Sequence, residues 1–317
     1  MKFLICGMGS IGVRHFQNLK HLGFNDISLY STGNSNYPKI EELTKDIPRY
    51  NNLNQALAQN PDVCMITNPT SMHVETAIEA ANKGCHLYIE KPLSHNLTNL
   101  AELNKIINQK NLITFVTYQF RFHPHIQLLK DLLHNENQYG DAVWAQAEWS
   151  EYLPDWHPWE DYKQSYSAKK ELGGGVLRTQ IHPLNYLEYL FGDIEHLTAT
   201  TQSTGILDID VDDIADIQIS FKSKINATVH VDYIQKPRVH KLKIVTNKGR
   251  FHWNCHLNSL KFINLENKIT EFTNENFERN DMFVKMLEEY IDCVNNKTPT
   301  SFSIEQASKE LSLLLGE

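Results

Sequence analysis

The first 118 residues alternate short apolar runs with segments whose apolar residues recur every three or four positions. The runs predict buried strands, and the helical spacing predicts amphipathic helices. Strands that alternate with helices build a parallel sheet covered on both faces, and such crossovers are right-handed. We therefore expect a doubly wound α/β domain over residues 1–118. The expected strands are residues 3–6, 27–30, 63–67, 87–89 and 113–118, and the expected helices are residues 12–22, 74–83 and 97–108.

Residues 119–317 have a different pattern and are expected to form a second domain. Four runs in this part alternate apolar and polar residues, as half-buried strands do. Three of them lie close together in the sequence, so we expect an α+β domain with a large, mostly antiparallel open sheet. The expected strands are residues 142–151, 214–221, 227–233 and 241–246, and the expected helices are residues 125–134, 186–191 and 282–294.

Composition and charge narrow the class of protein. The chain has 30 Lys and Arg against 38 Asp and Glu, a formal net charge of -8, and its basic residues do not cluster. This argues against a nucleic-acid partner. No segment approaches the roughly 18 to 20 continuous apolar residues of a membrane span, and no export signal is visible, so we expect a cytoplasmic protein without a membrane partner. The five cysteines lack metal-ligand spacing, and we expect no metal.

A glycine-rich turn stands where the first expected strand gives way to a helix. The sequence from Gly7 reads Gly-Met-Gly-Ser-Ile-Gly, the G-x-G-x-x-G pattern of dinucleotide-binding turns. Gly7 permits the tight turn, Gly9 lets the backbone approach a pyrophosphate, and Gly12 lets the helix pack closely on the strand. Ser10 and Ile11 begin the helix, whose free N–H groups attract phosphate. We expect a dinucleotide to bind here, the alternative being a glycine-rich turn without a ligand.

The end of the second expected strand bears on the choice between NAD and NADP. An Asp or Glu about 20 residues past the turn usually holds the 2'-hydroxyl of NAD. Ser31, Thr32 and Asn34 stand in this region instead, and their side chains could donate hydrogen bonds to a 2'-phosphate, although no arginine accompanies them. We expect NADP or NAD as the cofactor, with a modest preference for NADP.

Two further motifs follow expected strands. Glu90-Lys91-Pro92 puts a lysine where a parallel strand ends, and ligands of open α/β sheets bind beyond that edge. Taken alone, the tripeptide is equally compatible with a solvated lysine before a proline. The third expected strand ends in a stretch that contains Asn68 and Pro69, and His73 follows. That histidine could face a cofactor or simply cap the next helix.

With these motifs the sequence resembles the Gfo/Idh/MocA oxidoreductases, which act mostly on sugars, cyclitols and sugar derivatives. The resemblance extends over nearly the whole chain and includes the glycine run 173–175 that leads to His182. Residues 152–162 and 165–168 resemble a bacterial subgroup often tied to surface-polysaccharide sugars. The resemblance implies a Rossmann domain for the cofactor and a C-terminal domain whose open sheet supports the substrate site and a homo-oligomer, either a dimer or a tetramer.

The resemblance also implies roles for individual residues. Lys91 would touch both the nicotinamide ribose and the reacting hydroxyl, and the Lys91–Pro92 bond is often cis in such proteins. His182 would transfer the hydroxyl proton, a task that suits imidazole because it titrates near neutrality. A purely structural histidine is the alternative. The other cofactor contacts expected beyond the glycine turn are Asn68, Pro69, His73 and Glu90.

The acid that usually accompanies this histidine is absent. Most members of the family have an Asp three or four residues earlier, where this chain has Thr179 and Arg178, and Asn185 stands where a second Asp often follows. Three consequences are open. Arg178 could pair with an anionic substrate, another acid could orient the imidazole, or the protein could turn over poorly. The candidate acids are Asp155, Glu160 and Asp161.

Two aromatic segments flank the expected domain change, and sugars commonly stack on aromatic faces. Domain junctions are also favoured positions for pockets. We therefore expect the two segments to contribute part of a substrate pocket. The expected substrate contacts are Tyr118, Arg121, His123, Trp156, Tyr162, Arg178, Thr179 and His182, with His157 in the same group.

We interpret the chain as an oxidoreductase that moves a hydride between nicotinamide and a hydroxyl or keto carbon of a sugar or sugar nucleotide. Lys91 and His182 would carry the chemistry. Two alternatives remain, because a fold alone does not settle function. One is a catalytically weak dinucleotide-binding protein, and the other is a reductase of a non-sugar carbonyl or imine.

Overall fold

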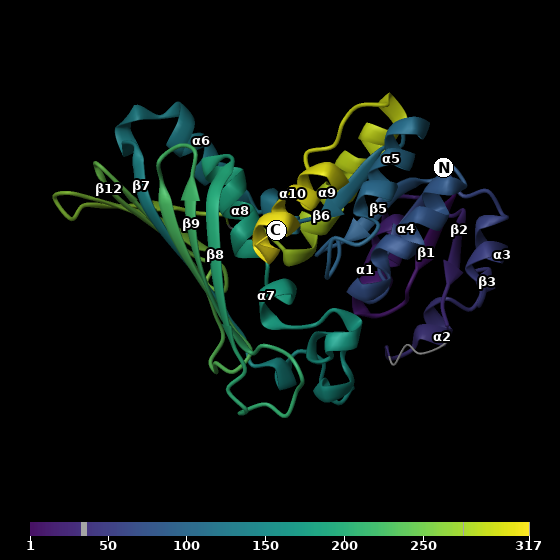
Figure 1. Ribbon diagram of the computed structural model, residues 1–317. Helices are drawn as coiled ribbons and strands as arrows, with labels where there is room; N and C mark the ends of the chain where they lie inside the picture. Colours follow the sequence, from purple (N-terminus) through teal and green to yellow (C-terminus); the bar gives the residue numbers. More distant parts are fainter. Residues whose placement is uncertain (33–36, 275, 317) are drawn as a thin grey trace.

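Two sheets form the frame of the protein in the computed structural model, which describes residues 1–32, 37–274 and 276–316 (Figure 1). Asn34, a candidate contact of a 2'-phosphate, lies outside the described residues. The first sheet occupies one end of the molecule and the second sheet the other, and the chain crosses between them more than once. The expected α/β fold class, with a parallel sheet followed by a mostly antiparallel one, is confirmed.

The first sheet is parallel throughout and has the strand order β3-β2-β1-β4-β5-β6. Its central strands are fully buried because helices cover both faces. The order reverses between β1 and β4, so a crevice opens at the carboxyl ends of these two strands. The strands are β1 (Phe3–Cys6), β2 (Ile27–Tyr30), β3 (Arg49–Tyr50), β4 (Val63–Ile66), β5 (His86–Glu90) and β6 (Thr114–Thr117), and the helices are α1 (Ser10–His21), α2 (Ile40–Leu43), α3 (Leu53–Leu57), α4 (His73–Asn82) and α5 (Leu100–Lys110).

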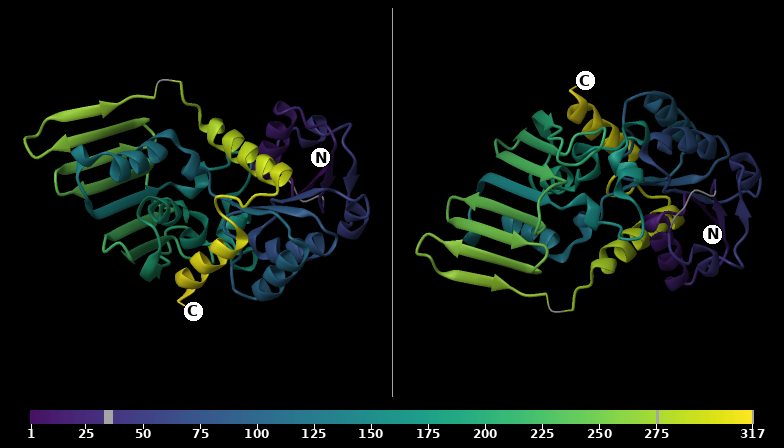
Figure 2. Two further views of the ribbon diagram at one scale, coloured as in Figure 1. Left: turned by 90° about the horizontal axis from the view of Figure 1, so that it is seen from above. Right: turned by 90° about the horizontal axis from the view of Figure 1, so that it is seen from below.

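The second sheet has the order β14-β13-β12-β11-β7-β10-β9-β8, and only β7 and β10 run parallel. Its strands alternate buried and exposed residues because helices α6 and α8 cover one face and leave the other open (Figure 2). The strands are β7 (Ala142–Ser150), β8 (Ile194–Gln202), β9 (Ile214–Phe221), β10 (Asn226–Asp232), β11 (Val239–Thr246), β12 (Gly249–Asn254), β13 (Ser259–Asn264) and β14 (Ile269–Phe272), and the helices are α6 (Pro124–Asn135), α7 (Val176–Thr179) and α8 (His182–Phe191).

The sequence pattern did not predict β3, β8, β12, β13 and β14, of which β3, β8 and β14 lie at sheet edges. The edge strand β8 is largely exposed and rich in threonine, so it lacks the alternation that marks a half-buried strand. The strand β3 is only two residues long. In both cases the position is set by pairing with a neighbouring strand more than by burial of an apolar face.

The last two helices return to the first sheet. Helix α9 (Arg279–Asn296) packs against α1, and helix α10 (Ile304–Leu315) packs against β6 and α5 (Figures 1 and 2). The backbone N–H of Val116 donates to the carbonyl of Phe302 at 3.0 Å, which ties the edge strand to this segment. The expected boundary at residue 118 lies just after β6, but helix α10 contacts β6 and β8 and thus both sheets.

Candidate functional site

A cavity of about 1920 Å³ opens between the two sheets and is lined by residues of both. Ordinary ligand pockets measure roughly 300 to 1,000 Å³, so this one has room for a dinucleotide and a second molecule. Every expected cofactor contact lines the cavity except Gly12. Those that do are Gly7, Gly9, Ser10, Ile11, Ser31, Thr32, Asn68, Pro69, His73, Glu90 and Lys91.

The glycine turn has the geometry that a dinucleotide requires. A Cβ atom on Gly7, whose φ is +105°, would come within 2.5 Å of the Asn68 nitrogen, and one on Gly12 would come within 2.2 Å of the Gly7 carbonyl. These two glycines therefore let the turn pack against the neighbouring loop and helix. A Cβ on Gly9 would meet nothing within 4 Å, so open space lies over the start of α1. That space and the free N–H groups of the helix fit a pyrophosphate.

Hydrogen bonds tie together the loops that follow β1, β4 and β5. The Thr67 hydroxyl donates to the Gly7 carbonyl at 2.7 Å. The buried ring of His73 lies between two carbonyls, 2.9 Å from that of Asn68 and 3.0 Å from that of Pro92. Both ring nitrogens of His73 are therefore held by backbone carbonyls at the start of α4. The side chain stabilises the cavity wall and leaves no ring nitrogen free for a ligand.

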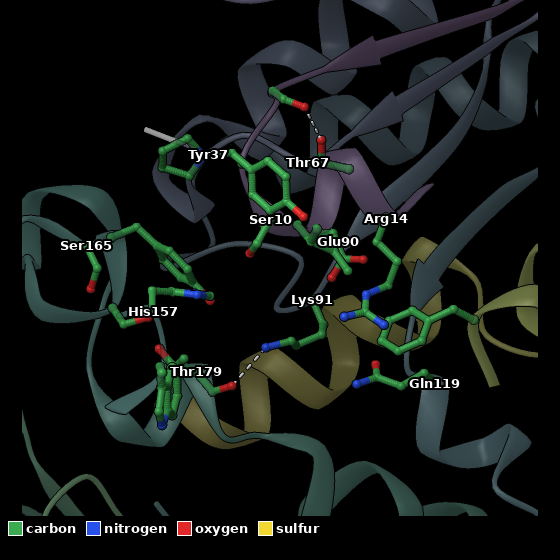
Figure 3. Close-up of a pocket in the computed structure, with 18 of the residues that line it drawn as sticks. Ser10, Arg14, Tyr37, Thr67, Glu90, Lys91, Gln119, His157, Ser165 and Thr179 are labelled. Carbon is green, nitrogen blue, oxygen red and sulfur yellow. Dashed lines mark hydrogen bonds between the residues drawn. The ribbon is translucent and has the colours of Figure 1, made fainter. Parts of the chain in front are cut away.

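Lys91 reaches from the first domain to the second across the centre of the cavity (Figure 3). Its Nζ donates to the Thr179 carbonyl at 2.9 Å, and the Lys91–Pro92 bond is cis. The preceding Glu90 is buried and lies 2.8 Å from the Nε2 of His15. Burial alone would raise the pKa of Glu90, but the contact with His15 and the charge of Lys91 lower it. The carboxylate therefore anchors the motif while the ammonium stays available to a ligand.

His182 begins helix α8 and is only 1% exposed at the floor of the cavity. The Trp149 ring stacks on it at 5.3 Å between centroids. Its Nε2 lies 3.0 Å from the Nε2 of Gln119, whereas its buried Nδ1 has no hydrogen-bond partner. Burial lowers the pKa of His182 well below its ordinary value, and the positive charge of Lys91 lowers it further. The ring is therefore neutral near neutral pH.

No carboxylate in the described parts of the chain forms a hydrogen bond with His182. Asp155 lines the cavity but forms an ion pair with Lys236 at 2.6 Å, and Asp161 accepts the backbone N–H of Lys163 at 3.0 Å. The polar side chain in contact with His182 is Gln119, which carries no charge. The hypothesis that one of the candidate acids replaces the missing Asp is therefore not supported by these contacts.

Five of the expected substrate contacts do not line the cavity. His123 caps helix α6 by accepting the His125 backbone N–H at 3.1 Å. Arg178 turns back along its own segment and donates to the Gly174 carbonyl at 3.3 Å. Trp156, His157, Thr179 and His182 do line the cavity. The five residues that do not are Tyr118, Arg121, His123, Tyr162 and Arg178.

Tyr118 and Arg121 belong to a buried polar network behind His182. The Tyr118 hydroxyl donates to Glu310 of helix α10, and Asn185 donates to the same carboxylate at 2.8 Å. Arg121 donates to Asn185 at 2.7 Å and lies over the Phe302 ring. Burial raises the pKa of Glu310 to about 7, and the nearby charge of Glu188 adds to this effect. The network joins the C-terminal helix to the site floor.

This raised pKa predicts how stability depends on pH. Between about pH 4.5 and 7 the unfolded chain has an ionised Glu310 while the folded protein keeps it protonated, so the folded protein binds more protons and loses stability as pH rises. We expect Glu310→Gln to remove this loss, which amounts to about 1 to 3 kcal/mol. Urea unfolding at pH 5 and pH 8 measures the difference.

The matched control is Glu305→Gln, which changes an exposed residue of the same helix that pairs with Lys309. It should leave the pH dependence of the parent unchanged. If Glu310→Gln and the parent lose the same free energy of unfolding between the two pH values, Glu310 is already ionised in the folded protein and the assignment is wrong.

Sequence reasoning missed several residues that line the cavity. Gln119 lies two residues after the last strand of the first sheet, and a polar residue near that edge could have been noticed. Trp149 lies within a predicted strand, where an apolar residue suggests only core. Arg14, Arg238 and Arg279 also line the cavity, but they come from distant parts of the chain, and nothing in their local sequence indicates that they meet.

The described residues offer neither a membrane-spanning helix nor a cluster of metal ligands. No helix there has the length and apolar character needed to cross a membrane. Within the same residues, no three His, Cys, Asp or Glu side chains gather in a way that could hold a metal ion.

Comparisons with known proteins agree with this arrangement. Residues 1–118 match the profile of the oxidoreductase family described as having an NAD-binding Rossmann fold, and residues 126–252 match the GFO/IDH/MocA C-terminal domain. An uncharacterised oxidoreductase of Synechocystis is 32% identical over 47% of this chain and 40% of its own length. The myo-inositol 2-dehydrogenase of Thermotoga maritima is 26% identical over 43% of this chain. That match covers 41% of the dehydrogenase, so the chain spans less than half the length of these relatives.

Solved structures share the fold over the whole chain. An oxidoreductase from Desulfitobacterium hafniense, described as putatively NADPH-dependent, superposes with a TM-score of 0.85 at 15% identity, over 99% of this chain and 94% of the other. The UDP-N-acetylglucosamine 3-dehydrogenase of Acidithiobacillus ferrooxidans gives 0.79 at 16% identity, over 100% and 96%. With its Rossmann domain and its matching C-terminal domain, the chain belongs to the Gfo/Idh/MocA oxidoreductase family.

Proposed function

We propose that the protein is an NAD(P)-dependent oxidoreductase that moves a hydride to or from a hydroxyl or keto carbon of a sugar or sugar nucleotide. The observation that carries the proposal is the meeting of Lys91, His182 and the glycine turn in one cavity. The relatives include dehydrogenases named for myo-inositol and levoglucosan, and a structural neighbour is named for UDP-N-acetylglucosamine. These names favour a carbohydrate-like substrate.

Lys91 and His182 are proposed to act on the reacting oxygen. The hydride chemistry itself is what a nicotinamide cofactor supplies when bound. The Lys91 ammonium would donate a hydrogen bond to the substrate oxygen and stabilise negative charge there. Because His182 is neutral, it can accept the hydroxyl proton, and its lowered pKa would make the resulting imidazolium ready to release it. In the free protein the Gln119 amide donates to His182 Nε2, so a substrate hydroxyl would replace Gln119 at that nitrogen before its proton is transferred.

The test is turnover with a panel of carbohydrates. Purified protein is mixed with NAD or NADP and with myo-inositol, levoglucosan, glucose or UDP-N-acetylglucosamine, and absorbance at the nicotinamide band is followed. We expect cofactor reduction with at least one of them. Cofactor binding without reduction in any mixture would favour the alternative, a catalytically weak dinucleotide-binding protein. The uncharged partner of His182 is the observation behind that alternative.

We propose a modest preference for NADP over NAD. Ser31 and Thr32 line the cavity at the end of β2 and bring no carboxylate to the position of a 2'-phosphate. Substituting Ser31→Asp should weaken NADP binding by about 10-fold or more, because a carboxylate there repels the phosphate and suits the free 2'-hydroxyl of NAD. Fluorescence titration with NADPH and NADH gives both dissociation constants. A parent protein that binds NADP no more tightly than NAD would contradict the preference.

We propose that the protein is a homo-oligomer, either a dimer or a tetramer. The face of the second sheet opposite α6 and α8 supports this, since no helix covers it in the described chain (Figure 2). Sedimentation that finds only monomer at micromolar concentration would remove the proposal. A cytoplasmic location, a role in surface-polysaccharide sugar metabolism and a division into domains of residues 1–118 and 119–317 stay predictions.

A further inference from the structure

The cavity wall carries two exposed arginines that the proposed chemistry does not use. Arg238 lies in the connection between β10 and β11, and Arg279 is the first residue of α9. Their segments are far apart in the sequence, yet both line the cavity that Lys91 and His182 also line. In a chain with a net charge of -8, two exposed arginines in one cavity need an explanation.

The neighbouring acids do not form ion pairs with the arginines. Glu151 lines the same cavity, and its carboxylate lies 3.9 Å from His256, whose pKa is lowered. Glu278 and Asp281 hold each other's backbone N–H groups in the capping box that begins α9. Among the described residues, no carboxylate lies within ion-pair distance of Arg238 or Arg279. Their guanidinium groups therefore remain available to a ligand.

The charges of both arginines act on a neighbouring histidine, His256. Burial is the largest cause of the lowered pKa of His256, and the positive charges of Arg238 and Arg279 lower it further. The charge of Arg279 also lowers the pKa of His182. The positive charge of Arg279 also contributes to lowering the pKa of the Arg14 guanidinium. An anion bound beside these guanidinium groups would offset their positive charge. The space over Gly9 that fits the cofactor pyrophosphate lies at the start of α1, the helix against which α9 packs, whereas Arg238 comes from the β10–β11 connection of the second sheet.

We propose that Arg238 and Arg279 bind a phosphate group of the substrate, so that the substrate is a phosphorylated sugar or sugar nucleotide and not a neutral sugar. This inference rests on the proposed function, because it assigns a ligand to the same cavity. Guanidinium groups suit phosphate since their planar fork can donate two parallel hydrogen bonds. A cavity of about 1920 Å³ leaves room for such a substrate beside a dinucleotide.

The experiment is calorimetric titration of the NADH-loaded protein with glucose, glucose 1-phosphate and UDP-glucose. We expect the phosphorylated ligands to bind at least about 10-fold more tightly than glucose, and Arg238→Ala and Arg279→Ala each to weaken them about 10- to 100-fold. Arg238→Lys and Arg279→Lys should recover part of the loss. Lys105→Ala, which removes an exposed positive charge on α5, should change nothing. Binding of glucose 1-phosphate and UDP-glucose alike points to a single phosphate, and binding of UDP-glucose alone points to a nucleoside diphosphate.

Glucose binding as tightly as both phosphorylated ligands would overturn the inference, and so would a preference that survives both alanine substitutions. Thermal melting checks that each variant is folded, which we expect because both arginines are exposed. The result is separable from the proposed function. Arginine-dependent binding without any cofactor reduction would refute the oxidoreductase proposal alone, and oxidation of neutral sugars without a preference for phosphate would refute this inference alone.

Discussion

Substituting Lys91→Met should lower kcat on the order of 10³-fold while leaving cofactor binding nearly intact. The Nζ of Lys91 is the charged donor at the centre of the cavity, and its partner in the free protein is a backbone carbonyl that a substrate oxygen can replace. A donor aimed at developing negative charge typically contributes about 10²- to 10³-fold, and proton-transfer assistance contributes a comparable factor. Steady-state kinetics and NADH fluorescence titration measure the two effects separately.

Two controls make this result specific. Lys105→Met removes an exposed lysine of α5 and should leave kcat unchanged. Lys91→Arg keeps the positive charge but displaces the donor atoms, and should recover only part of the activity. Turnover of Lys91→Met within tenfold of the parent would mean that the lysine only lines the wall, which was the alternative for this motif.

Substituting Gly9→Val should abolish cofactor binding without unfolding the protein. No protein atom lies within 4 Å of the position that a Cβ on residue 9 would take. The valine side chain would therefore occupy the space over α1 that fits a pyrophosphate. The backbone at Gly9 is extended, with φ −73° and ψ −171°, a conformation that valine tolerates. We expect the dissociation constant for NADH to rise by about 100-fold or more. The free energy of unfolding should fall by only about 1 kcal/mol, because valine is a poorer N-cap.

The same substitution at Gly7 provides the contrast. A side chain there meets the Asn68 backbone at 2.5 Å in a region of positive φ, so Gly7→Val should cost about 2 to 4 kcal/mol of stability. Urea unfolding separates the two cases. If Gly9→Val destabilises the protein as much as Gly7→Val does, the open space over Gly9 is not a ligand site.

The uncharged hydrogen-bond partner of His182 has a mechanistic consequence. A carboxylate partner would stabilise the imidazolium, whereas the amide of Gln119 does not. With burial and the charge of Lys91 also acting against protonation, the ring stays neutral, and any proton it accepts must pass on quickly. We therefore expect the substrate oxygen to depend on Lys91 more than it would in a site with an acid beside the histidine.

Some features followed from sequence because they depend on local rules. Strand and helix periodicity predicted the five longer strands of the first sheet, and the glycine spacing predicted the phosphate turn, since both reflect backbone geometry over a few residues. Edge strands such as β8 were missed because an exposed strand has little apolar pattern. The aromatic and basic residues near Tyr118 were predicted to contact substrate, but composition does not reveal which way a side chain points.

The sequence by itself determined the parallel sheet, the mostly antiparallel second sheet and the positions of Gly9, Lys91 and His182 along the chain. Only the tertiary structure decided what surrounds them. It put Gln119 beside His182, turned Arg121 toward the C-terminal network, and brought Arg238 and Arg279 to the lining of one cavity. The reason is physical. Local patterns fix which face of an element is buried, whereas the partners of a polar side chain depend on contacts between segments that lie far apart in sequence.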